Sequence, residues 1–240
     1  MTSSVLPAAG PRMRHQGPPP GVLATIYTVL FCTGLWLVTS FSGKPYFPGP
    51  WESASTIVAF FRTRPHAALE CGFFHFGAAI VLGLFTATVV NQMRFLGVRA
   101  AGVNIALFGG LATAFNMFVS AFTLWTLAQP GIAQDGGVTM ALYYLGFAFG
   151  GPGFSVPLGL LMAGISIPAM FMKLLPRWVA IAGMVLGVCG ELSWLNMLFP
   201  KLLFLIPLTR FPGFLWLMAA GFLLPRTVAA GKAQPSAQSF

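Results

Sequence analysis

Charged residues are scarce in this chain, and acidic residues are the scarcest of all. Its 240 residues include 7% charged residues and only four Asp and Glu, against 57% hydrophobic residues. A soluble domain usually carries about a quarter charged residues, so this chain lacks the charge needed to coat one. The composition therefore predicts an all-α, polytopic membrane helical bundle whose main partner is the lipid bilayer.

Cysteine is also rare, and the few charges are mostly positive. The three cysteines, Cys32, Cys71 and Cys189, all fall within apolar segments, and an odd number argues against a disulfide framework. The net charge is +9, but Lys and Arg lie in the gaps between apolar runs, as they do beside membrane spans. No basic cluster is interleaved with stacking aromatics in a polar domain, so we expect no nucleic-acid partner.

Six apolar segments are long enough to cross a hydrocarbon core of about 30 Å. They predict spans at about 22–41, 67–90, 100–127, 154–172, 178–198 and 206–224, which form a single transmembrane domain over residues 21–225. The first span lacks a small-x-small cleavage site, so we expect it to be retained. Residues 1–20 are rich in Pro and Gly and residues 226–240 are polar, which predicts a disordered tail at each end.

Two segments depart from simple spans. The apolar run from Thr139 to Met172 is too long for one span, and Gly150 to Gly153 breaks it with the sequence GGPG. We therefore expect Met140 to Phe149 to be a separate half-helix, either interfacial or re-entrant. After the first span, Trp51 to Phe61 predicts a short interfacial helix whose aromatic side chains dip into the membrane.

The basic residues indicate the orientation of the bundle. With a cytoplasmic N-terminus, eight Lys and Arg fall on the inner side (Arg12, Arg14, Arg94, Arg99, Lys173, Arg177, Arg226 and Lys232), and five on the outer side (Lys44, Arg62, Arg64, Lys201 and Arg210). Inner segments carry the excess of positive charge in membrane proteins. The sequence therefore predicts a multi-pass protein of the inner cell membrane with both termini in the cytoplasm.

The last two spans carry the motifs LPRW, from Leu175 to Trp178, and RFPGFLWL, from Arg210 to Leu217. With these motifs, the last quarter to third of the chain resembles a group of uncharacterised bacterial multi-pass membrane proteins that share a domain of unknown function. The resemblance implies a bacterial inner-membrane protein of six or seven spans, and it implies no catalytic residues.

Small and polar residues recur on single helical faces in two of the spans. In the third span, such residues are spaced by three or four and share one face, namely Gly109, Thr113, Asn116, Ser120 and Thr123. In the fifth span, Gly183, Gly187 and Glu191 are spaced by four. Such stripes predict the faces that pack against other helices, so we expect Glu191 to point into the bundle.

Glu191 is the most informative polar residue, because an unpaired carboxylate at membrane depth is costly. Arg210, in the next span, is within reach of it. One hypothesis places an outward-facing pocket here, for a small solute, a proton or another ion, formed by Glu70, His75, Asn116, Tyr143, Glu191, Asn196 and Arg210. In the alternative, Glu191 and Arg210 form a structural pair in a protein that binds a lipid or protein partner without transport.

Other chemistry finds little support in the sequence. Cys71 and His75 are four residues apart, as two metal ligands on a helix would be, but no second pair of ligands accompanies them. Ser155 follows a helix break, yet a serine hydrolase also needs a histidine and an oxyanion hole beside the nucleophile. Phosphate-binding and metalloprotease motifs are absent. We therefore expect no metal and no cofactor, and we favour a role other than catalysis.

Overall fold

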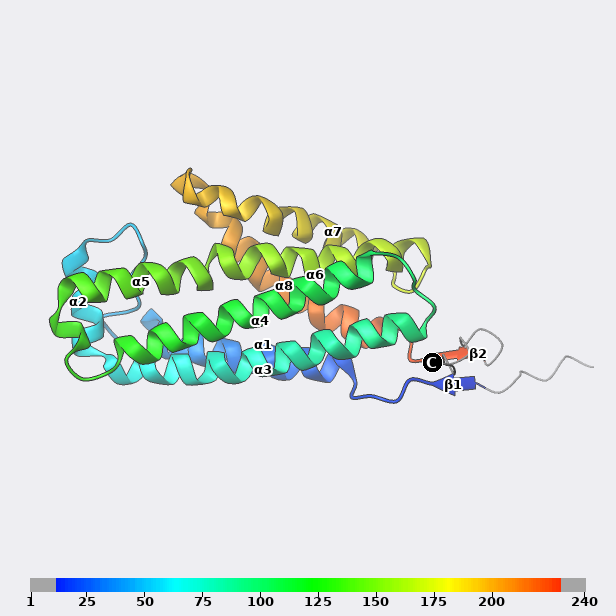
Figure 1. Cartoon of the computed structure of the whole chain (residues 1–240), viewed down its shortest axis with the longest axis horizontal. Helices are drawn as coiled ribbons and strands as arrows, with labels where there is room; N and C mark the ends of the chain where they lie inside the picture. The colour runs from blue at the N-terminus through cyan, green and yellow to red at the C-terminus, as the bar shows by residue number, and fades with distance from the viewer. Residues whose placement is uncertain (1–11, 230–240) are drawn as a thin grey trace, which may run out of the picture.

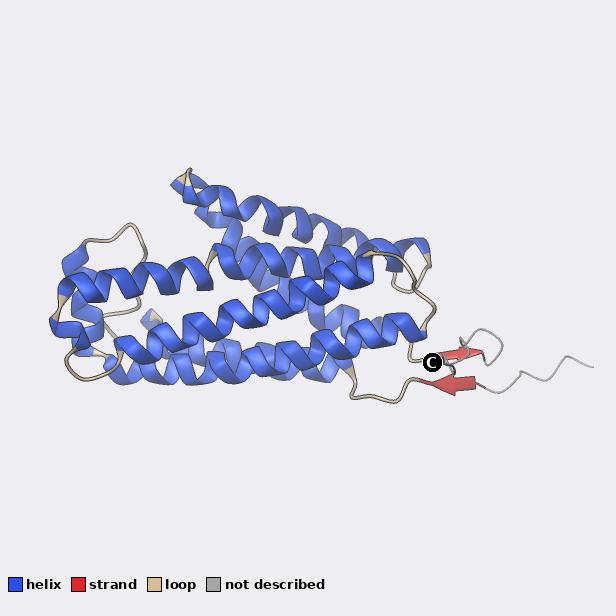
Figure 2. Cartoon of the chain, in the orientation of Figure 1, coloured by secondary structure: helices blue, strands red, loops and turns tan. Residues whose placement is uncertain are grey.

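The chain folds into a bundle of long helices that lie side by side (Figure 1), as seen in a computed structural model that describes residues 12–229. Helix accounts for nearly all of the described regular structure (Figure 2). The helices are α1 (Pro20–Val38), α2 (Ala54–Thr63), α3 (Pro65–Phe95), α4 (Gly102–Leu127), α5 (Gly136–Gly150), α6 (Pro152–Phe171), α7 (Arg177–Leu192) and α8 (Leu205–Leu223). Short 3-10 turns are η1 (Ser40–Ser42), η2 (Ile132–Gln134), η3 (Ser193–Met197) and η4 (Pro200–Phe204).

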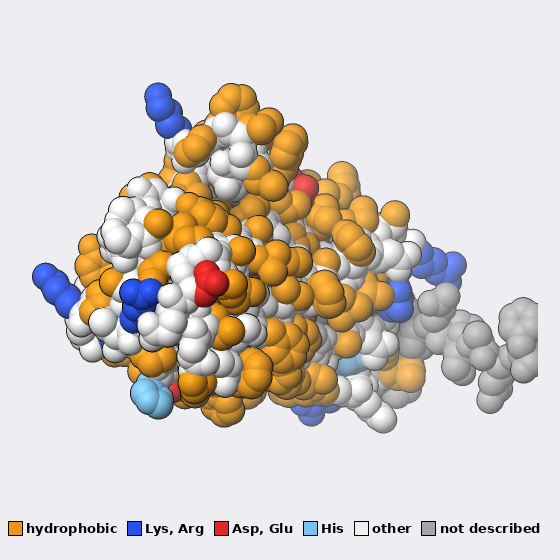
Figure 3. Space-filling model, turned by 60° about the vertical axis from the view of Figure 1, so that its left-hand side comes forward, with side chains coloured by type: hydrophobic (Ala, Val, Ile, Leu, Met, Phe, Trp, Pro, Cys, Tyr) orange, Lys and Arg blue, Asp and Glu red, His pale blue; other side chains and the backbone are white. Residues whose placement is uncertain are grey.

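Six helical segments are long and apolar enough to span a membrane, which confirms the predicted multi-pass helical bundle. They run over Pro20–Val38, Pro65–Phe95, Gly102–Leu127, Gly136–Phe171, Arg177–Met197 and Pro200–Leu223. Apolar side chains cover most of the visible face in Figure 3, and Lys and Arg gather toward its ends. This distribution is that of a protein whose flank faces lipid and whose ends face water.

The segments that flank the bundle are partly ordered, contrary to the disordered tails we expected. Strand β1 (Arg12–Arg14) pairs antiparallel with β2 (Thr227–Ala229) at the end where the described chain begins and finishes (Figure 1). Gln92 of α3 supports this sheet by donating from Nε2 to the carbonyls of Leu224 and Pro225, at 3.1 and 2.9 Å. The predicted disorder of residues 1–11 and 230–240 lies outside the described residues.

The fourth span is broken at Gly151, as the sequence GGPG predicted. Its two parts, α5 and α6, nevertheless follow one another in nearly the same direction (Figure 1). At 1.5 Å per residue, the 36 residues from Gly136 to Phe171 extend over about 54 Å, well beyond a hydrocarbon core of about 30 Å. The half-helix therefore continues the line of the fourth span and does not turn back as a re-entrant loop would.

The short helix after the first span also differs in its surroundings from the interfacial helix we expected. Phe60 and Phe61 of α2 are buried at 0% and 1% exposure within the protein, where they pack with Ile57 and Tyr143. Trp51 precedes the helix and is exposed. The aromatic residues of α2 thus build a second hydrophobic core at the end of the bundle opposite the β1–β2 sheet, which we call the distal end.

The polar stripe on α4 packs against α5 and α6, as its spacing predicted. A side chain at Gly109 would collide with the backbone of Pro157 and Leu161, at 2.5 Å from each. Pro157 has no N–H to donate to the carbonyl of Gly153 in the preceding turn. Asn116 Nδ2 donates to that carbonyl instead, at 2.5 Å, so a side chain of α4 satisfies the group that the proline leaves free.

Candidate functional site

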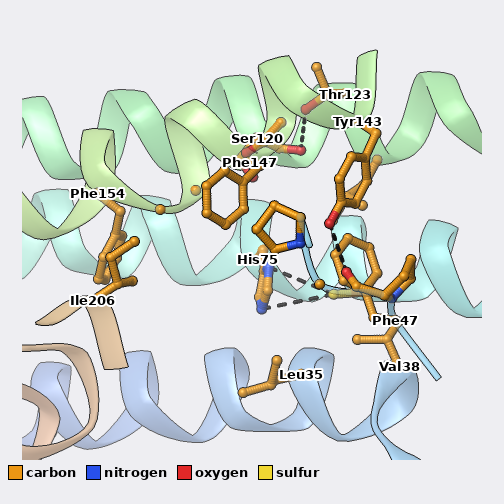
Figure 4. A pocket seen from close by; sticks show the side chains of 18 of the residues that line it. Leu35, Val38, Phe47, His75, Ser120, Thr123, Tyr143, Phe147, Phe154 and Ile206 are labelled. Atoms are coloured by element: carbon orange, nitrogen blue, oxygen red, sulfur yellow. Dashed lines mark hydrogen bonds between the residues drawn. The ribbon is translucent and has the colours of Figure 1, made fainter. Parts of the chain in front are cut away.

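A cavity of about 610 Å³ lies in the distal half of the bundle. Helices α1, α3, α4, α5, α6 and α8 and the turn η4 contribute to its wall. Residues 46–52 of the segment between η1 and α2, which we call the cap loop (residues 43–53), complete it. Most of the lining is aromatic or aliphatic. In Figure 4, Leu35 of α1 and Phe147 of α5 point into the same space from opposite sides, with His75 between them.

Arg210 of α8 is the one Lys or Arg among the described residues that line this cavity. Its Nη2 donates to the carbonyl of Gly150, the last residue of α5, and its guanidinium lies over the rings of Phe31 and Phe154, at 5.4 and 4.7 Å. The Nε atom is buried and has no hydrogen-bond partner within residues 12–229. Arg210 therefore bridges α8 to the helix break but keeps unused donors.

His75 of α3 lies on the cavity wall, where its ring stacks on Phe31 with a centroid distance of 4.3 Å. Its Nδ1 is 3.7 Å from the Sγ of Cys71, one turn earlier on the same helix. No group of three or more His, Cys, Asp and Glu that could hold a metal is found within residues 12–229. Cys71 and His75 thus meet as an isolated pair, which is too few ligands for a metal site.

Tyr143 of α5 holds the cap loop in place. Its hydroxyl donates to the carbonyl of Pro48 at 2.7 Å (Figure 4). Arg64, before α3, fixes the beginning of the same loop by donating to the carbonyls of Gly43 and Pro45, both at 3.1 Å. The loop is therefore a positioned part of the cavity wall, although Trp51 at its rim is 73% exposed.

The structure brings three of the seven predicted site residues to the cavity, namely His75, Tyr143 and Arg210. Three of the other four lie elsewhere. Glu70 is exposed near the start of α3. Asn116 is engaged with the carbonyl of Gly153, and Asn196 donates to the carbonyl of Ser193 within η3. Both asparagines satisfy backbone groups where helices are irregular, which is a structural task.

Glu191 lies apart from Arg210, so the predicted ion pair is not formed. Its Oε1 is buried with no hydrogen-bond partner within residues 12–229. The reason is the rotation of α7. Gly187 and Gly190 face α6, where a side chain at Gly190 would lie 2.8 Å from the Cα of Gly159. Glu191 follows Gly190 by one residue and is half-buried beside this contact, whereas Arg210 points to the α5–α6 break.

The sequence reasoning missed most of the apolar cavity wall. Phe31 contacts both His75 and Arg210, yet it reads as one aromatic residue among many in the first span. The cap loop offered a better signal, because Pro45, Pro48 and Pro50 surround Tyr46 and Phe47. Such a sequence favours a fixed loop with aromatic side chains available for packing.

No family model, no curated protein and no solved structure matches this chain. The resemblance carried by the motifs around Trp178 and Arg210 therefore stays a prediction. The fold and the cavity are the observations from which a function must be inferred.

Proposed function

We infer that this membrane protein binds a small, largely apolar molecule in its distal cavity. The observation that carries this inference is the cavity of about 610 Å³ with an aromatic and aliphatic wall and a few polar groups. Small-molecule sites usually have volumes of about 300–1,000 Å³ and this kind of lining. The geometry supports the part of the pocket hypothesis that contains His75, Tyr143 and Arg210, and it leaves Glu191 out of the site.

The distribution of basic residues supports one orientation of the cavity in the membrane. By the order of the segments in the sequence, eight Lys and Arg belong to the side of the termini and five to the distal side. The positive-inside rule supports cytoplasmic termini in the inner cell membrane. In that orientation the cavity belongs to the outer half of the bundle, and the cap loop lies at its outer end.

Co-purification tests whether the cavity binds a ligand. The protein is extracted from its membrane, purified in mild detergent, and analysed for bound small molecules by mass spectrometry. Leu35→Trp enlarges a side chain that points into the cavity, so we expect it to displace the molecule. The matched control is Leu84→Trp, because Leu84 is exposed on the flank of α3 and does not line the cavity. Equal recovery from both variants would refute binding in the cavity.

Transport of the bound molecule is a second candidate, and the break at Gly151 favours it. Broken helices form the substrate site in many transporters. A disulfide between cysteines placed on α5 and α8 would fix this break in one position. A transporter would then still bind its molecule but would no longer carry it into proteoliposomes. Unchanged uptake after cross-linking would leave binding alone as the function.

A further inference from the structure

The charge inside the distal cavity is one-sided. Arg210 brings a cation to the wall, and the only carboxylate among the described lining residues is that of Glu52 in the cap loop. The Oε1 of Glu52 accepts a hydrogen bond from the Gly49 amide at 3.0 Å, within the cap loop itself. His75 stacks on Phe31 and carries no negative charge. Among the described residues, no carboxylate therefore pairs with the positive charge of Arg210.

A guanidinium in this position has bonding capacity to spare. It carries five N–H donors, of which one bonds the carbonyl of Gly150 and the buried Nε–H has no partner. The rings of Phe31 and Phe154 stabilise the cation by cation–π contact but supply no negative charge. A cation inside a membrane protein is costly unless it is paired. The chemical complement of such a cation is an anion.

The rest of the cavity suits a hydrocarbon body. Side chains such as Leu35, Val38 and Phe147 surround the space between Arg210 and the cap loop. A volume of about 610 Å³ is that of a site for one small molecule, whereas a phospholipid with two acyl chains is larger. At the rim, Phe204 and Trp51 are 57% and 73% exposed, so the entrance itself is apolar.

We propose that the cavity binds a single-chain organic anion of the fatty-acid type. Its carboxylate pairs with Arg210, and its hydrocarbon chain runs among the apolar side chains toward the cap loop. Arg and carboxylate groups match geometrically, because two parallel N–H donors meet two acceptor oxygens. The apolar rim beside Phe204 provides an entrance for a molecule that is dissolved in the bilayer. This assignment rests on the proposed function and adds the class of ligand.

Photo-crosslinking tests the charge of the ligand directly. The full-length protein is placed in phosphatidylcholine nanodiscs with a diazirine analogue of palmitate or with the matching diazirine alcohol, and the labelled peptides are mapped by mass spectrometry. We expect the palmitate analogue to label cavity residues such as Phe147, and unlabelled palmitate to compete. The alcohol should label them far less, because it has no negative charge for Arg210.

Variants of Arg210 separate charge from folding. Arg210→Met should lower cavity labelling by the palmitate analogue about tenfold or more, as expected for removal of one partner of a buried charge pair. Arg210→Lys should retain much of the labelling. Lys201→Gln removes an exposed cation of η4 that does not line the cavity, so it should have no effect. Cavity labelling by the alcohol at the same level in Arg210→Met as in the unaltered protein shows that the variant is folded.

Each contrary outcome has a distinct meaning. Equal labelling by the acid and the alcohol, unaffected by Arg210→Met, would overturn the anionic ligand but leave binding in the cavity intact. Absence of cavity labelling by both probes would overturn the proposed function itself. Competition by dioleoylphosphatidylglycerol as strong as that by palmitate would replace the single-chain anion with a phospholipid.

Discussion

Near the termini the helices of this bundle meet backbone to backbone, whereas at the distal end they surround a cavity. On the terminal side, a side chain at Gly221 would lie 2.6 Å from the backbone nitrogen of Gly21, and Leu82 and Phe85 are fully buried. On the distal side, α5 and α8 line a space of about 610 Å³. The same long helices, α3 and α4, run through both regions.

The difference arises from what lies between the helices. Glycines allow close contact from the middle of the bundle to the termini, and dispersion forces there stabilise the packing as they do in other membrane bundles. On the distal side of the break at Gly151, large aromatic residues and the cap loop line the cavity and keep the helices apart. The bundle thus combines a solid region, where helix backbones meet, with a hollow region that has the space the proposed ligand requires.

The largest effect is expected in the middle of the bundle, where the backbones of α6 and α7 meet. Gly190→Ala would place a methyl group 2.7 Å from the carbonyl oxygen of Ser155 and 2.8 Å from the Cα of Gly159. Backbone atoms cannot move aside as a flexible side chain can, so we expect the free energy of unfolding to fall by about 1–3 kcal/mol. Thermal unfolding in detergent measures it.

The matched control is Gly83→Ala on α3. A methyl group there meets nothing within 4 Å, so only the gain in helix propensity remains, about 0.5 kcal/mol. If Gly190→Ala proved as stable as Gly83→Ala, the idea that glycine contacts stabilise the bundle would be wrong.

A smaller effect is expected where α4 repairs the irregular start of α6. Asn116→Leu removes the donor to the Gly153 carbonyl. It should lower the free energy of unfolding by about 1 kcal/mol, within the range of polar contacts between membrane helices. In a Pro157→Ala background the new backbone N–H can bond that carbonyl, so the cost should fall by about half or more.

A second double-mutant cycle, of Ser120 with Pro157, provides the control. Ser120 donates to the carbonyl of Gly146, which Pro157 does not affect. Ser120→Ala should therefore cost the same in both backgrounds. A cost of Asn116→Leu that does not depend on residue 157 would mean that the asparagine has another role.

The sequence predicts the fold because the constraints of a bilayer act on every turn of every span. Length and hydropathy predicted six spans, although the fourth begins at Gly136 and not at about residue 154, and the GGPG sequence located the break at Gly151. The stripe from Gly109 to Thr123 identified the packed face of α4, because only small or paired polar groups are tolerated there.

The site was predicted less well, because it depends on how helices rotate about their axes. Glu191 and Gly187 share one helical face by spacing, yet Gly190 makes the contact with α6 and leaves Glu191 beside it. Arg210 was identified as a site residue but with the wrong partner. Its neighbours Phe31 and Phe154 come from two other helices, and no spacing within one helix reveals such a meeting.

The hollow region should open locally without disturbing the solid one. Tyr143→Phe removes the hydroxyl that donates to Pro48, so we expect the cap loop to lose about 1 kcal/mol of local stability. Amide hydrogen exchange in the cap loop should then rise several-fold, while the amides of β1 and β2 stay unchanged. Tyr144→Phe is the control, since Tyr144 is exposed and has no such bond in the described structure. Faster exchange throughout the bundle would show that the two regions are coupled.

The smallest effect concerns the β1–β2 sheet at the solid end, and it depends on pH. Burial, together with the nearby charge of Arg226, lowers the pKa of His15 below its usual value of about 6.5. The neutral ring also fits its surroundings, because its Nε2 accepts from Asn91 Nδ2 at 3.1 Å. The folded state therefore favours the form without the extra proton.

The sign of the effect follows from this difference in pKa. When the sheet opens, His15 regains its ordinary pKa. At a pH between the two pKa values, the open state therefore binds more protons than the closed state. Stability of the sheet is complete above about pH 6.5 and falls as the pH drops toward the lower pKa of the closed state. Exchange of the β1–β2 amides, corrected for the intrinsic rate, should thus quicken from pH 7.5 to pH 5, and His15→Gln should abolish the change. The same acceleration in the cap loop, or its persistence in His15→Gln, would assign the pH response to another group and weaken the distinction between the two ends.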